Sequence, residues 1–92
     1  MSTTSPVTLY TTAWCPYCLR AKQLLDHKGS AYHEIRVDGQ PELRQEMMQR
    51  SGQYTVPQIW VGERHVGGCD ELYSLERAGQ LEPLLAEAAQ AG

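Results

Sequence analysis

The chain has 92 residues, of which 41% are hydrophobic, and a net charge of −3 at pH 7. This length allows one domain with one core, so we expect residues 1–92 to form a single domain with residues 1–5 as a loose tail. The acidic balance argues against a nucleic-acid-binding protein, which needs a basic face, and no apolar run approaches the length that spans a membrane.

The three cysteines are an odd number, which argues against the disulfide framework of a small secreted protein. The segment from Met1 to Pro6 also lacks the charged and apolar regions of a signal peptide. Thiols that stay reduced are typical of proteins in the cytoplasm. We therefore expect a cytoplasmic protein.

The first half of the chain predicts two strands and two helices. Residues 6–12 are β-prone, and residues 16–28 predict a helix that ends at Gly29. Residues 32–37 alternate between two faces, as a half-exposed edge strand does. A second helix should begin at Pro41 and end at Gly52. The side chains that recur at helical spacing in the first helix are Cys18, Ala21, Leu24 and Leu25.

The second half predicts a hairpin followed by two helices. Residues 57–61 and 64–66 should form strands joined by Gly62 and Glu63 in a type II′ turn, which favours glycine first. Residues 70–78 predict a third helix, and a fourth follows from the spacing of Leu81, Leu84, Leu85 and Ala88. The order β-α-β-α-β-β-α-α predicts an α/β fold with a mixed four-stranded sheet and helices on both faces.

The segment Cys15-Pro16-Tyr17-Cys18 lies where the first strand gives way to the first helix. A C-x-x-C pair at such a junction is typical of a redox site. With Cys15 as N-cap, Pro16 falls at the first helical position, where its missing N–H costs nothing. The free N–H groups and the helix dipole then favour the thiolate of Cys15, which is the nucleophilic form. Cys18 should face inward, where it can close a disulfide but is poorly placed to attack a bulky substrate.

Two further segments accompany this motif, namely Thr55-Val56-Pro57-Gln58-Ile59 and Gly67-Gly68-Cys69-Asp70-Glu71-Leu72. Together with the stretch from Thr11 to Cys18, they resemble a dithiol glutaredoxin of the small bacterial glutaredoxin 3 type. The resemblance covers about residues 6–88 and implies the thioredoxin-like fold. It also implies an enzyme that uses glutathione to reduce glutathione mixed disulfides and protein disulfides, with Cys15 and Cys18 as its catalytic residues.

The resemblance further implies a groove that binds glutathione. Pro57 would follow a cis peptide bond, so that Val56 pairs with the cysteinyl backbone of the ligand. Asp70 would cap the helix, accept a hydrogen bond from the α-amino group, or do both, and N–H groups of the helix would hold the γ-glutamyl carboxylate. Gly67 and Gly68 would let the backbone approach the ligand. The residues that the resemblance assigns to glutathione are Tyr17, Gln53, Thr55, Val56, Pro57, Gly68, Cys69 and Asp70.

One position departs from the family pattern. Many glutaredoxins carry a lysine three residues before the first cysteine, whereas this chain has Thr12. The change removes a cation that would favour the thiolate and bind a carboxylate, and leaves Arg20 and Lys22 as candidates to replace it. Cys69 has two interpretations: a small buried apolar residue, which we favour, or a thiol that forms a secondary disulfide.

Three other functions fit the sequence less well. A zinc site built from Cys15, Cys18 and Cys69 lacks an apparent fourth ligand. Relatives that bridge an iron–sulfur cluster usually have Gly or Ser after the first cysteine, where this chain has Pro16, and thioredoxins typically have Gly-Pro between their cysteines. We therefore expect a monomer with no metal and no tightly bound cofactor, and with glutathione as co-substrate. The implied protein partners are glutathionylated or disulfide-containing proteins, ribonucleotide reductase among them.

Overall fold

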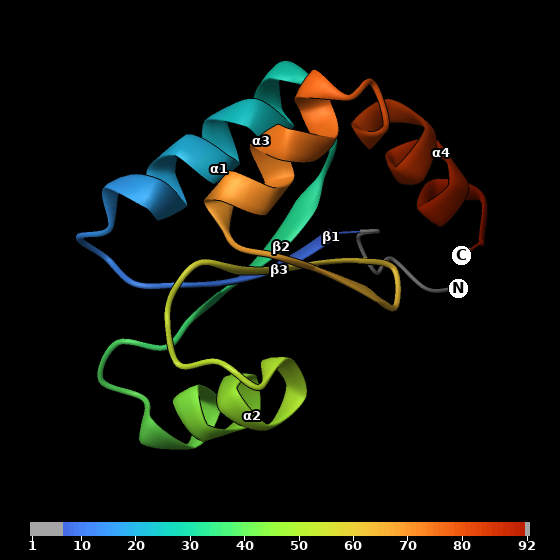
Figure 1. Cartoon of the computed structure of the whole chain (residues 1–92). Coiled ribbons are helices and arrows are strands. Elements are labelled where there is room, and N and C mark those ends of the chain that lie inside the picture. Colours follow the sequence, from blue (N-terminus) through green and yellow to red (C-terminus); the bar gives the residue numbers. More distant parts are fainter. Residues whose placement is uncertain (1–6, 92) are drawn as a thin grey trace.

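A computed structural model describes residues 7–91, and its elements follow the predicted order (Figure 1). The elements are β1 (Val7–Thr11), α1 (Pro16–His27), β2 (Tyr32–Arg36), α2 (Pro41–Ser51), β3 (Gln58–Val61), β4 (Arg64–Gly67), α3 (Cys69–Arg77) and α4 (Leu81–Ala91). The tail expected over residues 1–5 lies outside the described residues. No helix among residues 7–91 is both long enough and apolar enough to cross a membrane.

The four strands form one mixed sheet in the order β2-β1-β3-β4. β1 runs parallel to β2 and antiparallel to β3, which in turn pairs antiparallel with β4. β2 therefore lies at an edge, as its alternating pattern predicted. Gly62 begins the turn between β3 and β4 with a φ of 61°, the sign that the first position of a type II′ turn requires.

Helices cover both faces of the sheet, as predicted: α1, α3 and α4 lie on one face and α2 lies alone on the other (Figure 1). The side chains of the central strand β1 alternate between the two faces of the sheet, and both sets are buried because helices cover both faces. Leu9 packs with the helices of the first face, whereas Tyr10 packs against Met47 of α2 and Trp60 of β3. The ten buried residues of the larger cluster are Val7, Leu9, Ala21, Leu24, Leu25, Ile59, Val61, Leu72, Leu81 and Leu85.

Predicted boundaries differ from the observed ones by one residue at several places. α1 ends at His27, because Lys28 is its C-cap and Gly29 adopts a left-handed φ of 69°. β3 begins at Gln58 rather than at Pro57, since proline cannot donate to the ladder. α3 begins at Cys69, one residue earlier than predicted, with Gly68 as its N-cap.

Candidate functional site

Cys15 and Cys18 occupy the predicted positions at the start of α1. Cys15 is the N-cap, and its sulfur accepts a hydrogen bond from the backbone N–H of Cys18 over 3.2 Å. The Cys15 side chain is partly exposed, whereas Cys18 is only 1% exposed. Burial, together with the hydrogen bond to Cys15, raises the pKa of the Cys18 thiol to about 12. One sulfur is thus accessible and contacts a helix N–H group, and the other is held protonated inside.

The peptide bond between Val56 and Pro57 is cis, as the resemblance implied. Pro57 is buried directly before β3, and the carbonyl oxygen of Val56 lies 3.9 Å from the sulfur of Cys15. The loop that joins α2 to β3 therefore meets the start of α1, although 41 residues separate the two contacting positions.

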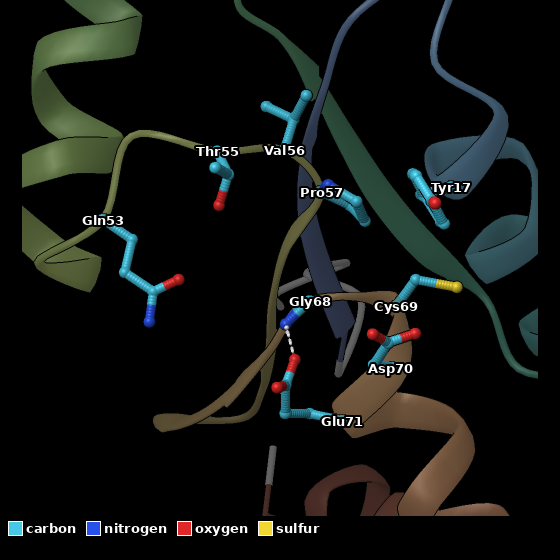
Figure 2. A pocket seen from close by; sticks show the side chains of 9 residues that line it. All are labelled: Tyr17, Gln53, Thr55, Val56, Pro57, Gly68, Cys69, Asp70 and Glu71. Carbon is cyan, nitrogen blue, oxygen red and sulfur yellow. Dashed lines mark hydrogen bonds between the residues drawn. The ribbon is translucent and has the colours of Figure 1, made fainter.

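A pocket of about 260 Å³ lies beside this contact, between the start of α1, the loop before β3 and the start of α3 (Figure 2). All eight residues that the sequence assigned to glutathione line it. The full lining consists of Tyr17, Gln53, Thr55, Val56, Pro57, Gly68, Cys69, Asp70 and Glu71. Three segments far apart in the sequence thus contribute to one surface next to Cys15.

Glu71 is a pocket residue that the sequence analysis missed. Its Oε1 accepts a hydrogen bond from the N–H of Gly68 over 2.8 Å (Figure 2). A glutamate at the third helical position that reaches back to the N-cap is half of a capping box, a signal that was present in the sequence. The other half is missing because Gly68 has no side chain. Glu71 therefore fixes the turn that carries Gly68 and Asp70.

The two glycines of this turn lie close to their neighbours. Gly67 has a φ of 118°, and a Cβ placed there would lie 3.0 Å from Cγ of Glu71. A Cβ on Gly68 would lie 3.3 Å from Oε1 of Glu71 and 3.4 Å from the carbonyl oxygen of Pro57. Gly67 is thus favoured by the backbone conformation, whereas a Cβ on Gly68 would be in contact with Glu71 and the Pro57 carbonyl.

Cys69 lines the pocket but is 6% exposed, and burial raises the pKa of its thiol. Both observations suit the small buried apolar residue that the sequence favoured.

Lys22, a candidate to replace the family lysine, is paired with Glu34 over 3.0 Å. The Lys22 cation is therefore already paired with a carboxylate, which also accepts a hydrogen bond from Thr11. In the described part of the chain, no three His, Cys, Asp or Glu side chains lie close enough to hold a metal ion.

Comparisons with known proteins identify the family. The glutaredoxin family model matches residues 7–66. The chain is 65% identical to a glutaredoxin of Pseudomonas aeruginosa over 80 residues, which are 87% of this chain and 95% of that protein. It is 52% identical to glutaredoxin 3 of Escherichia coli over 79 residues, 86% of this chain and 95% of that one.

A solved structure shows the same fold with a ligand. It is the crystal structure of a buckwheat glutaredoxin–glutathione complex, which matches with a TM-score of 0.86 at 34% identity and covers 92% of this chain and 80% of that one. The mixed four-stranded sheet, the C-x-x-C pair at the start of α1 and these relatives lead to one assignment. The chain belongs to the glutaredoxin family and is a glutathione-dependent thiol–disulfide oxidoreductase.

Proposed function

We propose that Cys15 is the attacking thiolate, that Cys18 is the resolving thiol, and that the pocket beside them holds glutathione. The observation that carries this proposal is the contact between the Cys15 sulfur and the Val56 carbonyl, which places the accessible sulfur at the edge of the pocket. A glutathionyl group bound there would present its sulfur to Cys15.

The reaction proceeds by two thiol–disulfide exchanges. The Cys15 thiolate attacks the glutathionyl sulfur of a mixed disulfide, so that the new Cys15–glutathione bond forms as the old S–S bond breaks. The substrate sulfur leaves as a thiolate and takes a proton from water. A second glutathione thiolate then attacks the bound glutathionyl sulfur, which releases glutathione disulfide and restores the Cys15 thiolate.

A second route serves protein disulfides. The Cys15 thiolate attacks one sulfur of the substrate disulfide, so that a Cys15–substrate bond forms as the substrate S–S bond breaks, and the other substrate sulfur leaves as a thiolate that takes a proton from water. Cys18 then loses its proton and attacks the Cys15 sulfur. The Cys15–Cys18 disulfide closes, and the substrate sulfur that was bound to Cys15 leaves as a thiol. Because burial raises the pKa of Cys18, its proton must pass to the departing thiolate for this route to proceed.

The pocket offers a partner for each polar end of glutathione. The carboxylate of Asp70 would accept from the α-amino group, and N–H groups at the start of α3 would hold the γ-glutamyl carboxylate. The backbone of Val56 would pair with the cysteinyl residue, Tyr17 would line one wall, and Gln53 would bind the glycine carboxylate. Asp70 is exposed and Gln53 is exposed, so both side chains are accessible to a ligand.

We further propose that residues 1–92 form one functional domain that acts as a monomer in the cytoplasm. The single sheet that joins all four strands supports one domain. Its protein substrates would be glutathionylated or disulfide-containing proteins, with ribonucleotide reductase as a specific candidate. Glutathione would act as a co-substrate that leaves after each cycle, without a tightly bound cofactor.

The proposal is tested by reduction of the cysteine–glutathione mixed disulfide, coupled to NADPH and glutathione reductase. Asp70→Asn removes the carboxylate charge and should raise KM about tenfold or more, because a hydrogen bond to a charged group contributes roughly 1.5–3 kcal/mol. Alkylation of Cys15 by iodoacetamide should remain at the wild-type rate. An unchanged KM would remove Asp70 from the glutathione site.

A further inference from the structure

A buried amide lies behind the pocket, on the residue that follows Pro57 in the chain but does not itself line the pocket. Gln58 is the first residue of β3 and is 0% exposed. Its Nε2 faces three acceptors, the carbonyl oxygen of Thr55 at 3.0 Å, Oγ1 of Thr55 at 3.2 Å and Oε1 of Gln53 at 3.1 Å, which share its two N–H groups. Gln53 and Thr55 are both exposed and both line the pocket. Gln58 thus holds two pocket residues from inside.

The orientation of this amide follows from its partners. The carbonyl oxygen of Thr55 can only accept, so the atom of Gln58 that faces it must be the donor Nε2. Oε1 of Gln58 then faces Nε2 of His65 at 2.7 Å. His65 must therefore carry its proton on Nε2 and donate it to Gln58.

His65 is held by aromatic packing. Its ring lies 4.6 Å from the ring of Trp60, which is 4% exposed. On the same indole, the guanidinium carbon of Arg50 lies 4.5 Å from the ring centroid and so makes a cation–π contact. His65, which donates to Gln58, is thus fixed on β4, the strand that pairs with β3.

The same logic fixes the amide of Gln53. Because its Oε1 is bound by Gln58, the oxygen is turned inward and the NH₂ group is the free end. Figure 2 shows the two atoms of this amide, with the oxygen on the side of Thr55. A carboxylate ligand accepts hydrogen bonds and would be repelled by an amide oxygen, so this orientation suits an anion.

We propose that Gln58, oriented by His65, is a positioning residue that turns the Gln53 amide so that it donates to a carboxylate of the substrate. The inference rests on the proposed function and deepens it. Gln58, which does not touch the ligand, determines whether the Gln53 amide presents its NH₂ donor or its oxygen acceptor to the ligand. The other side-chain hydrogen bonds to this loop, from Arg44 to the Tyr54 carbonyl and between Ser51 and the backbone of Gln53, involve backbone atoms of the loop and do not orient the Gln53 side-chain amide.

The first test replaces Gln58 by leucine, which is similar in size but has no donor. Gln58→Leu should raise KM for the cysteine–glutathione mixed disulfide about three- to tenfold, as expected when one or two hydrogen bonds are lost. The rate at which iodoacetamide alkylates Cys15 should not change. Tyr10→Phe is the matched control: Tyr10 pairs with Gln58 across β1 and β3, and the change removes part-buried hydrogen bonds with Glu46 and Arg50 of α2, neither of which involves the loop.

The second test separates positioning from general stability. His65→Gln keeps a side-chain N–H donor and should retain the wild-type KM, whereas His65→Leu should raise it. In a double-mutant cycle, Gln53→Leu and Gln58→Leu should have less than additive effects on KM, because the second acts through the first. If Gln58→Leu does not fold, two other variants test the positioning role. They are His65→Leu, and Gln58→Glu in the same double-mutant cycle with Gln53→Leu.

Three results would overturn the inference: an unchanged KM in folded Gln58→Leu, strictly additive effects in the cycle, or equal losses in Tyr10→Phe. The wild-type protein tests the proposed function separately, by comparing the cysteine–glutathione mixed disulfide with cystine, which has no glutathionyl group. Equal kcat/KM values for these two substrates would overturn both proposals. If the wild type clearly prefers the mixed disulfide but Gln58→Leu leaves KM unchanged, only the positioning role of Gln58 would be overturned.

Discussion

The backbone N–H of Cys18 donates a hydrogen bond to the sulfur of Cys15 across 3.2 Å. This N–H belongs to the first turn of α1, where it has no partner within the helix. The Cys15 sulfur thus faces a helix N–H donor at the surface, while burial raises the pKa of Cys18 and keeps that thiol protonated. The two thiols of one motif therefore lie in unequal surroundings, which supports the different roles proposed for them.

Substitution of each cysteine should separate these roles. Cys15→Ser should abolish both thiol transfer and rapid alkylation near pH 7, because it removes the accessible sulfur. Cys18→Ser should still reduce glutathione mixed disulfides but lose the reduction of protein disulfides that need two thiols. Mass spectrometry of partly alkylated wild-type protein measures which cysteine reacts first. If Cys18 were modified before Cys15, the assignment would be reversed.

The stability of the reduced protein should fall at alkaline pH partly through Cys18. Its pKa is about 12 in the folded state against 9.0 for an unperturbed thiol, so the unfolded chain loses this proton first. The contribution is complete below pH 9 and is lost as pH rises from about 9 toward 12. Denaturant midpoints measured from pH 8 to 11 should decline more steeply in wild type than in Cys18→Ala. Parallel curves would contradict the prediction.

The two glycines before α3 should differ in their tolerance of alanine. Gly67→Ala places a Cβ at a φ of 118° and 3.0 Å from Cγ of Glu71. It should lower the free energy of unfolding by about 1–2 kcal/mol. Gly68→Ala meets its nearest atom at 3.3 Å and should cost less stability, but it should weaken glutathione binding by crowding the Pro57 segment. Thermal unfolding and KM, measured on both variants, separate the two effects.

The two tryptophans should report oxidation differently. Trp14 is 95% exposed next to Cys15, whereas Trp60 is 4% exposed and packed against Tyr10 and His65. Because Trp14 precedes Cys15 in the chain, closure of the Cys15–Cys18 disulfide should change its surroundings more than those of Trp60. The emission difference between reduced and oxidised protein should therefore disappear in Trp14→Phe. A difference that persists in this variant would have to come from Trp60.

Position 12 tests the one departure from the family pattern. Thr12→Lys should add a cation near Cys15, speed alkylation of its thiolate and tighten the glutathione mixed disulfide. The gain should be about 0.2–1 kcal/mol, because the pair is exposed to solvent. Higher salt should reduce it, since charges are screened over roughly 8–10 Å near physiological ionic strength. Thr12→Gln, of similar length without the charge, is the control. Equal rates in the two variants at low salt would place position 12 away from the site.

The sequence by itself determined the order of the elements and the chemistry of the motif. Strand and helix periods, prolines at helix starts and glycines at helix ends are local signals, so Pro16, Pro41 and Gly52 were sufficient to place α1 and α2 within a residue. The N-cap position of Cys15 follows from the same local logic. The eight pocket residues were named in advance only because three motifs resemble one family.

Only the tertiary structure decided how those motifs meet. The contact between Cys15 and Val56 spans 41 residues, and sequence periodicity carries no information about such distances. The link from His65 through Gln58 to Gln53 joins residues that are close in sequence, but periodicity could not show it, since it depends on the register of β3 with β4 and on which amide atom is buried. Burial, which raises the pKa of Cys18, and the hydrogen-bond geometry that orients Gln53 exist only once the chain has folded, because both depend on how the helices and strands pack together.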